Sequence, residues 1–358
     1  MILKQNNFIF HQKIVYLQNH SKLSIMKKNF MSLSVVYTTL FLFSLLTACG
    51  DNNTPSPNSS KDNLNFVAKV KDGIVIYHNG QELFSDEKAD IACAELYNNT
   101  LYCITKTTRT CTLHKIQGNK IEQEPLDYTS HFAIYKGKVY SLINKTLYIN
   151  GTAEGTFEPP LTVYAFDVDK QTGDVYVAGR VIANNTSTIT VFKNFEAVYQ
   201  YPSSSTIEGV NEELSILNFA CNNSSWYLML RYNRSNSTTQ NENLFAAESG
   251  TYVIKNGNNK TLISNEDIAI TAATAQNNKI YCAGMLNLSP YLWIDGKAQL
   301  LNSTGSYSDI AIYESKVYAT GITSDMKPIL TIDGIKQTHQ FLNAIKENVY
   351  NLLIAVPN

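Results

Sequence analysis

The sequence predicts an all-β fold in which seven repeated units of four short strands close into a ring. Three observations favour it: the composition, two motifs that each recur seven times, and an offset between the two chain ends. Charged residues make up 16% of the 358 residues, against about 25% in a typical protein, and 22 residues are tyrosine. Because tyrosine is enriched in strands, this composition favours β structure over helical bundles or disorder.

The first motif is a short strand in which an apolar residue precedes a tyrosine. Its copies are Leu101-Tyr102, Val139-Tyr140, Val175-Tyr176, Trp226-Tyr227, Ile280-Tyr281, Val317-Tyr318 and Val349-Tyr350. The second motif ends an apolar strand in a tight-turn dipeptide, where asparagine or aspartate and glycine supply the positive φ of a two-residue hairpin. Its copies are Asn79-Gly80, Gln117-Gly118, Asn150-Gly151, Asn194-Phe195, Asn256-Gly257, Asp295-Gly296 and Asp333-Gly334.

Each central unit contains four strands, A to D, seen most clearly at residues 267–273, 279–285, 291–294 and 297–301. The turn motif opens the folded part and the tyrosine motif closes it. We therefore expect residues 66–84 to supply only strands C and D of a shared unit, and residues 341–357 only its strands A and B. Four-stranded sheets repeated radially form a β-propeller, and a shared blade closes the ring.

Residues 64–358 divided among seven units give about 42 residues per unit, close to the roughly 40–50 of propeller repeats. The competing interpretation is two β-sandwiches of about 150 residues each, whose strands also recur regularly. Sandwiches do not account for the offset between the chain ends. The sequence therefore predicts a seven-bladed β-propeller with ring closure between N-terminal and C-terminal strands, in preference to six or eight blades.

Two repeats carry a resemblance to a known group of proteins. Residues 280–296 and 317–334 approach the pattern apolar-Tyr-x-Ala-Gly followed by Trp-x-Asp-Gly. They resemble the β-propeller repeats of bacterial secreted proteins and lipoproteins, and the match is looser over the rest of residues 64–358. The resemblance implies an architecture and no particular reaction.

An export signal precedes the repeats. An uncharged, mostly apolar run at residues 31–48 follows two lysines and ends at Cys49, which is the shape of a signal peptide. Residues 46–49, Leu-Thr-Ala-Cys, resemble the lipobox of bacterial lipoproteins, in which cleavage occurs before a cysteine that carries diacylglycerol. The alternative is a transmembrane anchor, because about 18 apolar residues are near the minimum that spans a bilayer. Small residues directly before Cys49 favour processing.

The expected organisation has four segments. Residues 1–25 are an upstream extension of the reading frame, 26–48 a lipoprotein signal peptide, 49–63 the lipidated cysteine with a flexible tether, and 64–358 the propeller domain. The tether contains no apolar residue that could pack. The resemblance to lipoproteins implies an exported protein held by its lipid at the outer membrane, facing the periplasm or the exterior. We expect a monomer.

Several classes of site are disfavoured. The formal net charge is −1, which argues against nucleic acid as a partner. The chain has no Gly-rich phosphate loop, no His-Glu-x-x-His and no Cys-x-x-Cys, and the histidines of the folded part lie at no ligand spacing from one another. Residues 167–174 superficially resemble a calcium loop but lack its glutamate at position twelve, so a polar hairpin is the better interpretation. We expect no cofactor and no metal.

Five cysteines remain after Cys49, namely Cys93, Cys103, Cys111, Cys221 and Cys282. An exported chain meets an oxidising compartment. A B–C hairpin centred on Thr107 would place Cys103 opposite Cys111, and this pair is the preferred disulfide. The alternative is that all five are small buried hydrophobic residues.

Arginines are rare in the folded part and share one location. All four, including Arg234, lie at or near the connection from a B strand to a C strand. In a propeller these connections share one face with the D-to-A loops, where we expect three Asp-Ile-Ala tripeptides to begin A strands and ring the channel mouth. The candidate ligand-binding residues are therefore Arg109, Arg180, Arg231, Asp90, Asp267 and Asp309. The alternative is a solvated rim.

Two classes of function remain open. The first is a non-enzymatic binding protein that holds a glycan, peptide or protein on this face. The second is a glycan hydrolase or lyase that uses channel carboxylates such as Asp267 and Asp309 as acid and base. Such enzymes normally need tryptophan platforms for sugars, and the chain has only Trp226 and Trp293, both on predicted strands. The sequence favours binding and assigns no catalytic residue.

Overall fold

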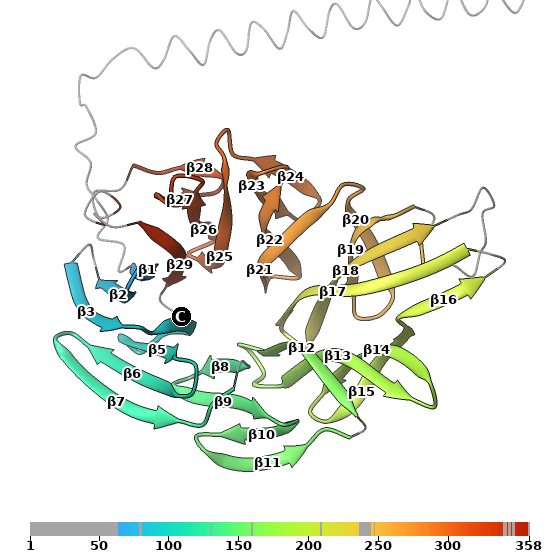
Figure 1. The fold of residues 1–358 in the computed structure, drawn as a ribbon, viewed down its shortest axis with the longest axis horizontal. Coiled ribbons are helices and arrows are strands. Elements are labelled where there is room, and N and C mark those ends of the chain that lie inside the picture. Colours follow the sequence, from blue (N-terminus) through green and yellow to red (C-terminus); the bar gives the residue numbers. More distant parts are fainter. Residues whose placement is uncertain are drawn as a thin grey trace, which may run out of the picture. The chain divides into compact units, whose positions relative to one another are not determined.

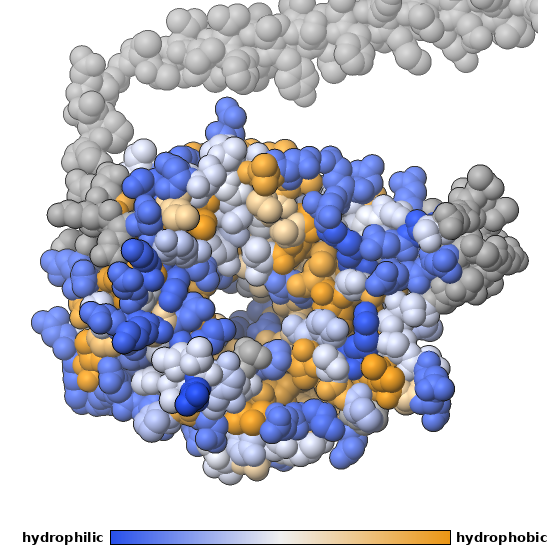
Figure 2. All heavy atoms as spheres, in the orientation of Figure 1, coloured by the Kyte–Doolittle hydropathy of each residue, from blue (hydrophilic) through white to orange (hydrophobic). Residues whose placement is uncertain are grey.

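The computed structural model describes residues 64–78, 81–129, 131–158, 160–207, 210–235, 245–246, 248–338, 342, 345 and 348–356. Within these residues the strands form seven antiparallel sheets arranged around a central opening (Figure 1). The space-filling view shows the ring hollowed at its centre (Figure 2). The domain is a seven-bladed β-propeller, as the repeats predict. The segments expected to form the signal peptide and the tether, with Cys49, lie outside the described residues, as does the turn dipeptide Asn79-Gly80.

The blades are numbered from the one that contains the N-terminal strands. Blade 1 joins β29 (Val349–Ala355) to β1 (Asn65–Val70), β2 (Gly73–His78) and β3 (Gln81–Glu87). Blade 2 contains β4 (Asp90–Tyr97), β5 (Thr100–Lys106), β6 (Cys111–Gln117) and β7 (Lys120–Leu126). Blade 3 contains β8 (Phe132–Tyr135), β9 (Lys138–Ile143), β10 (Thr146–Ile149) and β11 (Thr152–Thr156). Blade 4 contains β12 (Leu161–Val168), β13 (Val175–Ala183), β14 (Thr186–Lys193) and β15 (Glu196–Pro202).

Blade 5 is the one described sheet with five strands. It contains β16 (Ser204–Ile207), β17 (Val210–Asn222), β18 (Ser225–Ser235), β19 (Gly250–Lys255) and β20 (Asn259–Ser264). Blade 6 contains β21 (Ile268–Gln276), β22 (Lys279–Leu286), β23 (Ser289–Ile294) and β24 (Lys297–Leu300). Blade 7 contains β25 (Gly305–Tyr313), β26 (Lys316–Thr323), β27 (Pro328–Ile332) and β28 (Ile335–Lys336).

Blade 1 closes the ring, but with three N-terminal strands and one C-terminal strand, so the expected division of two and two is wrong. The A strand β29 pairs antiparallel with β1 along its length. Val349-Tyr350 copies the tyrosine motif yet lies on an A strand, whereas the other copies lie on B strands. On β1 the position of the tyrosine is taken by Asn65, which pairs with His78 just before the C–D turn, as Tyr318 pairs with Ile332. Because β1 lacks the tyrosine, the motif did not identify it as the B strand of blade 1.

Seven clusters of buried apolar side chains hold the ring together, one between each pair of adjacent blades. Tyr176 and Trp226, for example, belong to the cluster between blades 4 and 5. The cluster that includes Phe66, Leu352 and Tyr318 joins blade 1 to blade 7. Every blade therefore buries both of its faces, and the last interface depends on β29.

The two repeated motifs contact each other directly. In blades 3, 4, 5 and 7, the asparagine or aspartate of the C–D turn accepts a hydrogen bond from the backbone N–H of the residue that precedes the tyrosine. The pairs are Asn150 with Val139 (2.9 Å), Asn194 with Val175 (2.8 Å), Asn256 with Trp226 (2.8 Å) and Asp333 with Val317 (2.9 Å). The same turn residues have φ between 46° and 51°, a conformation that asparagine and aspartate tolerate well. Each turn thus fastens the start of the B strand.

The expected disulfide is absent, because Cys103 and Cys111 are both free and buried. The hairpin turn lies at residues 107–110, so Cys103 pairs with His114 while Cys111 pairs with Lys106. Three residues along a strand correspond to about 10 Å, whereas a disulfide needs Cα atoms within about 7 Å. Burial raises the pKa of the Cys103 thiol. The other described cysteines are also free; Cys221 and Cys282 are buried, as the alternative interpretation predicts, whereas Cys93 is only partly buried.

Candidate functional site

Two of the candidate arginines link adjacent blades. Arg180 on β13 and Arg231 on β18 are partly buried and lie at the same position of their repeats, four residues after the tyrosine. Arg180 Nη2 donates to the Leu214 carbonyl of blade 5 at 3.3 Å, and Arg231 Nη2 donates to the Ile268 carbonyl of blade 6 at 2.7 Å. Lys69 occupies the equivalent position in blade 1 and donates to a carbonyl just before blade 2. In blades 1, 4 and 5 this repeat position thus makes a hydrogen bond toward the next blade.

Asp267 is brought together with Arg231 in an ion pair. It precedes β21 and its side chain is 82% exposed, whereas the Arg231 side chain is 20% exposed. Solvent screening weakens the attraction between an exposed carboxylate and its cationic partner. The pair therefore presents a charged, accessible rim anchored on a partly buried guanidinium.

The three aspartates of the Asp-Ile-Ala tripeptides do not form one ring, which corrects the expectation. Asp90 is the first residue of β4 and is exposed, and its Oδ1 accepts the Ile91 N–H at 2.9 Å. Asp267 stands outside its strand. Asp309 lies well inside β25, next to the register shift after Tyr307, and lines the channel. The same tripeptide thus occurs at three different depths because the A strands begin at different points.

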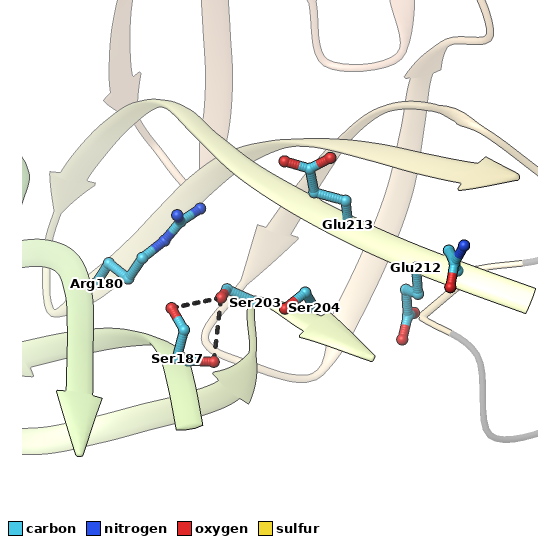
Figure 3. Close-up of a pocket in the computed structure, with 7 residues that line it drawn as sticks. Arg180, Ser187, Ser203, Ser204, Glu212 and Glu213 are labelled. Atoms are coloured by element: carbon cyan, nitrogen blue, oxygen red, sulfur yellow. Dashed lines mark hydrogen bonds between the residues drawn. The ribbon is translucent and has the colours of Figure 1, made fainter. Parts of the chain in front are cut away.

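Arg180 also lines a pocket of about 570 Å³ between blades 4 and 5. Figure 3 shows Arg180 of β13 facing the β17 residue Glu213 across the opening, with Ser187 and Ser203 below. The Ser203 hydroxyl donates to Ser187 Oγ at 2.7 Å. The full lining is Arg180, Ser187, Ser203, Ser204, Asn211, Glu212 and Glu213. The extra strand β16 and the long strand β17 create this polar pocket.

The Arg180 guanidinium has unused hydrogen-bonding capacity. Its Nε is buried and has no partner among the described residues. Its Cζ lies 5.9 Å from the ring centroid of Tyr164, which is 49% exposed. Tyr164 is the extra residue in a β-bulge of β12, and such bulges re-aim side chains. An accessible aromatic ring therefore lies beside this partly satisfied cation.

Arg109 is separate from this pocket. It lies in the exposed turn between β5 and β6, where its backbone N–H donates to Thr107 Oγ1 at 3.3 Å. Among the predicted site residues the structure thus joins only Arg231 and Asp267. The pocket serines and glutamates and Tyr164 were missed, because nothing in the sequence shows that the first residues of β17 line a pocket together with residues of blade 4.

The opposite end of the channel contains a second cavity, of about 620 Å³, formed by A strands and the A–B turns. Lys170 forms an ion pair with Glu95 and donates to the Ile134 carbonyl, so one side chain spans blades 4, 3 and 2. Burial disfavours the charged ammonium, but Glu95 and Asp167 hold the pKa of Lys170 above its ordinary value. Sequence inspection assigned nothing to this end.

Asp309 contacts this cavity and accepts two backbone hydrogen bonds, from Ile310 N–H and Ile354 N–H, both at 2.9 Å. Burial raises the pKa of its carboxyl group to about 6, although the two N–H groups favour the charged form. Each carboxylate oxygen thus accepts a hydrogen bond from a backbone N–H. Asp309 therefore acts as a link between blades 7 and 1.

The hairpin that superficially resembles a calcium loop is a polar turn. Buried Asp169 accepts the backbone N–H groups of Gln171 (2.8 Å), Thr172 (3.3 Å), Asn223 (3.0 Å) and Ser224 (2.6 Å). These donors belong to the A–B turns of blades 4 and 5. Across the described residues, no group of three or more His, Cys, Asp or Glu side chains gathers as metal ligands do. No helix in the described part of the chain is long and apolar enough to cross a membrane.

Neither a protein-family model nor a curated protein matches the chain. Among solved structures, apo AztD from Citrobacter koseri is similar with a TM-score of 0.43 and 11% identity, covering 81% of this chain and 97% of that one. The nidogen/laminin complex gives a TM-score of 0.39 and 8% identity, covering 82% and 98%. The propeller domain of the Trilobed protease from Pyrococcus furiosus gives 0.37 and 11%, covering 70% and 97%. The likeness concerns fold alone.

Proposed function

We propose that this chain is an exported lipoprotein, held at the outer membrane by lipid on Cys49, whose propeller binds a polar ligand on the face of the B–C and D–A connections. The observation that carries the binding proposal is the Arg180 pocket, with its buried Nε that lacks a partner among the described residues. The ligand is a glycan, peptide or protein segment. The binding partners are the membrane, through the lipid, and this ligand; the protein acts as a monomer.

The pocket chemistry suits a ligand that carries hydroxyl groups and one anionic group that reaches Arg180, because Glu212 and Glu213 also line the pocket. A guanidinium binds carboxylate, sulfate or phosphate in forked geometry, and each charge-assisted hydrogen bond contributes about 1.5–3 kcal/mol when shielded from water. Ser187 and Ser203 offer hydroxyl groups, while Glu213 accepts hydrogen bonds at the opening. Tyr164 offers a ring face beside the cation. Arg109, Asp90 and the Arg231–Asp267 pair stand farther around the same face.

The alternative, a glycan hydrolase or lyase, has weaker support. Asp309 uses both oxygens to accept backbone N–H groups, and Asp267 is paired with Arg231. Trp226 is 6% exposed and Trp293 is 3% exposed, so both tryptophans pack in cores between blades. Asp267 and Asp309 therefore do not form a catalytic carboxylate pair, and the two tryptophans do not form a platform for a sugar. A binding function is favoured over hydrolysis or lyase activity.

Anchoring is tested with Cys49→Ser. We expect the wild-type protein to partition with membranes and to carry acyl chains on Cys49 in mass spectra, and the variant to be released or left unprocessed. A mature N-terminus upstream of Cys49 without acyl chains would overturn the lipoprotein proposal. This test is independent of ligand binding.

Ligand binding is tested with alginate and hyaluronan tetrasaccharides and with an Asp/Glu-rich peptide, titrated calorimetrically into the full-length protein in detergent micelles. We expect Arg180→Gln to weaken binding about tenfold or more, because at least one charge-assisted bond is lost. Lys193→Gln is the control, since Lys193 lies at a C–D turn on the other face and pairs with Asp174 at 2.9 Å. A ligand whose affinity ignores Arg180→Gln but falls with Lys193→Gln would contradict the proposed face.

A further inference from the structure

One repeat position supplies most of the rim of the channel cavity. It is the last residue of the A strand, directly before the A–B turn. Its members in blades 2, 3, 5, 6 and 7 are Tyr97, Tyr135, Asn222, Gln276 and Tyr313, and all five line the cavity and are partly buried. Each pairs with the first residue of its B strand, so all five stand at one depth. Three tyrosines and two carboxamides thus surround the mouth.

Blade 4 departs from this pattern and closes part of the cavity. Its A–B connection is the longer turn held by Asp169, and it places Lys170 and Gln171 against the cavity. Gly173 of this turn has φ +79°, and a Cβ there would meet the Tyr135 ring at 3.0 Å. The turn therefore packs directly on the blade 3 tyrosine. The Lys170–Glu95 ion pair then fixes the wall, with Glu95 13% exposed.

The charged residues that line this cavity are three acidic and two basic. Glu95, Glu314 and Asp309 line it together with Lys136 and Lys170. Glu95 forms an ion pair with Lys170, and the Asp309 carboxylate accepts hydrogen bonds from two backbone N–H groups. No excess of cations is available to attract an anion. The cavity volume of about 620 Å³ falls within the range of small-molecule sites, roughly 300–1,000 Å³.

We propose that this mouth of the channel binds the end of a neutral oligosaccharide. Tyrosine rings offer apolar faces with a hydroxyl at the edge, which suits a sugar ring that has apolar C–H faces and polar rims. Asn222 and Gln276 each present a donor and an acceptor side by side, which matches adjacent sugar hydroxyls. The site is distinct from the Arg180 pocket and lies at the opposite end of the channel.

The test uses maltohexaose, cellohexaose, xylohexaose and chitohexaose, titrated into the full-length protein in detergent micelles. At least one of the four should bind. Tyr135→Ala and Gln276→Ala should each weaken that binding by about 3-fold to 10-fold, the loss expected from a removed ring contact or neutral hydrogen bond. Tyr135→Phe, which keeps the ring, should retain most of the affinity. Tyr128→Ala is the matched control, because Tyr128 is 52% exposed and lies on a D–A connection at the other face.

Three results would overturn the proposal: no binding of any of the four sugars, binding that ignores both Tyr135→Ala and Gln276→Ala, or binding that is lost in Arg180→Gln instead. The last would assign neutral sugars to the Arg180 pocket and leave the proposed function standing. Thermal midpoints of all variants separate lost binding from lost folding. If Tyr135→Ala fails to fold, Gln276→Ala and Tyr135→Phe still decide between these outcomes.

Discussion

The Asp309 carboxylate joins blade 7 to the C-terminal strand, because its Oδ2 accepts the Ile354 N–H at 2.9 Å while its Oδ1 accepts the Ile310 N–H at the same distance. Ile354 lies on β29, whose other edge pairs with the N-terminal strand β1. A single side chain thus connects the last full blade to the strand that closes the ring. The role of β29 in ring closure and the ionisation of Asp309 can each be measured.

Deletion of residues 349–358 should destabilise the whole domain. It removes Val349, Leu352 and Ile354, all buried in the cluster between blades 1 and 7, and exposes the unpaired edge of β1. We expect aggregation or cooperative unfolding at a clearly lower temperature by circular dichroism. Tyr350→Ala is the control, since this β29 side chain is 44% exposed and should change the midpoint little. A truncated protein that melts like full-length protein would contradict ring closure through β29.

The carboxyl group of Asp309 should make stability fall as pH rises. Burial raises its folded pKa from 3.8 to about 6, so between these values the folded state binds more protons than the unfolded state. Its contribution is fully present below about pH 4 and is lost as pH rises through 6. Relative to Asp309→Asn, the wild-type free energy of unfolding should decrease by up to about 3 kcal/mol from pH 4 to pH 7. Urea titrations that show a constant difference would refute this.

Arg231 should matter for stability as well as charge. Arg231→Ala removes the hydrogen bond to the Ile268 carbonyl and leaves that partly buried contact between blades 5 and 6 unmade, at a cost of about 1.5–3 kcal/mol. Arg109→Ala, in an exposed turn, should change the free energy of unfolding by less than about 0.5 kcal/mol. Denaturation midpoints in urea check both. Equal effects of the two changes would argue against the inter-blade role of Arg231.

The C–D turns should be sensitive to two separable features of asparagine. Asn150→Gly keeps the positive φ but removes the hydrogen bond to Val139 N–H, so we expect a loss of about 0.5–1.5 kcal/mol. Asn150→Ala also imposes the steric cost of positive φ on a Cβ-bearing residue, about 1–2 kcal/mol more. Thermal or urea unfolding of the two variants measures the difference. If alanine is tolerated better than glycine, the role given to φ is wrong.

The sequence by itself determined the β class, the number of blades and the location of most described C–D turns; in blade 2 the turn lies at residues 118–119, because Gln117 is the last residue of β6. These features depend on local chemistry: a turn such as Asp295-Gly296 needs positive φ at both positions, and the B strands repeat an apolar residue before tyrosine. Even ring closure followed from the offset between chain ends. The local pattern failed in blade 1, where Asn65 replaces the tyrosine of the B strand. The sequence therefore did not reveal that three N-terminal strands and one C-terminal strand form this blade.

Only the tertiary structure decided the pairing and the sites. Because the centre of the hairpin turn lies between residues 108 and 109 instead of at Thr107, the cross-strand pairing is displaced by three residues, which is why Cys103 faces His114 instead of Cys111. Arg180 and Arg231 meet carbonyl groups of the next blade, and Tyr97, Gln276 and Tyr313 share a channel mouth although they are far apart in the chain. Contacts between blades depend on how strands from different repeats pack, and a pattern along the sequence does not show which side chains that packing brings together.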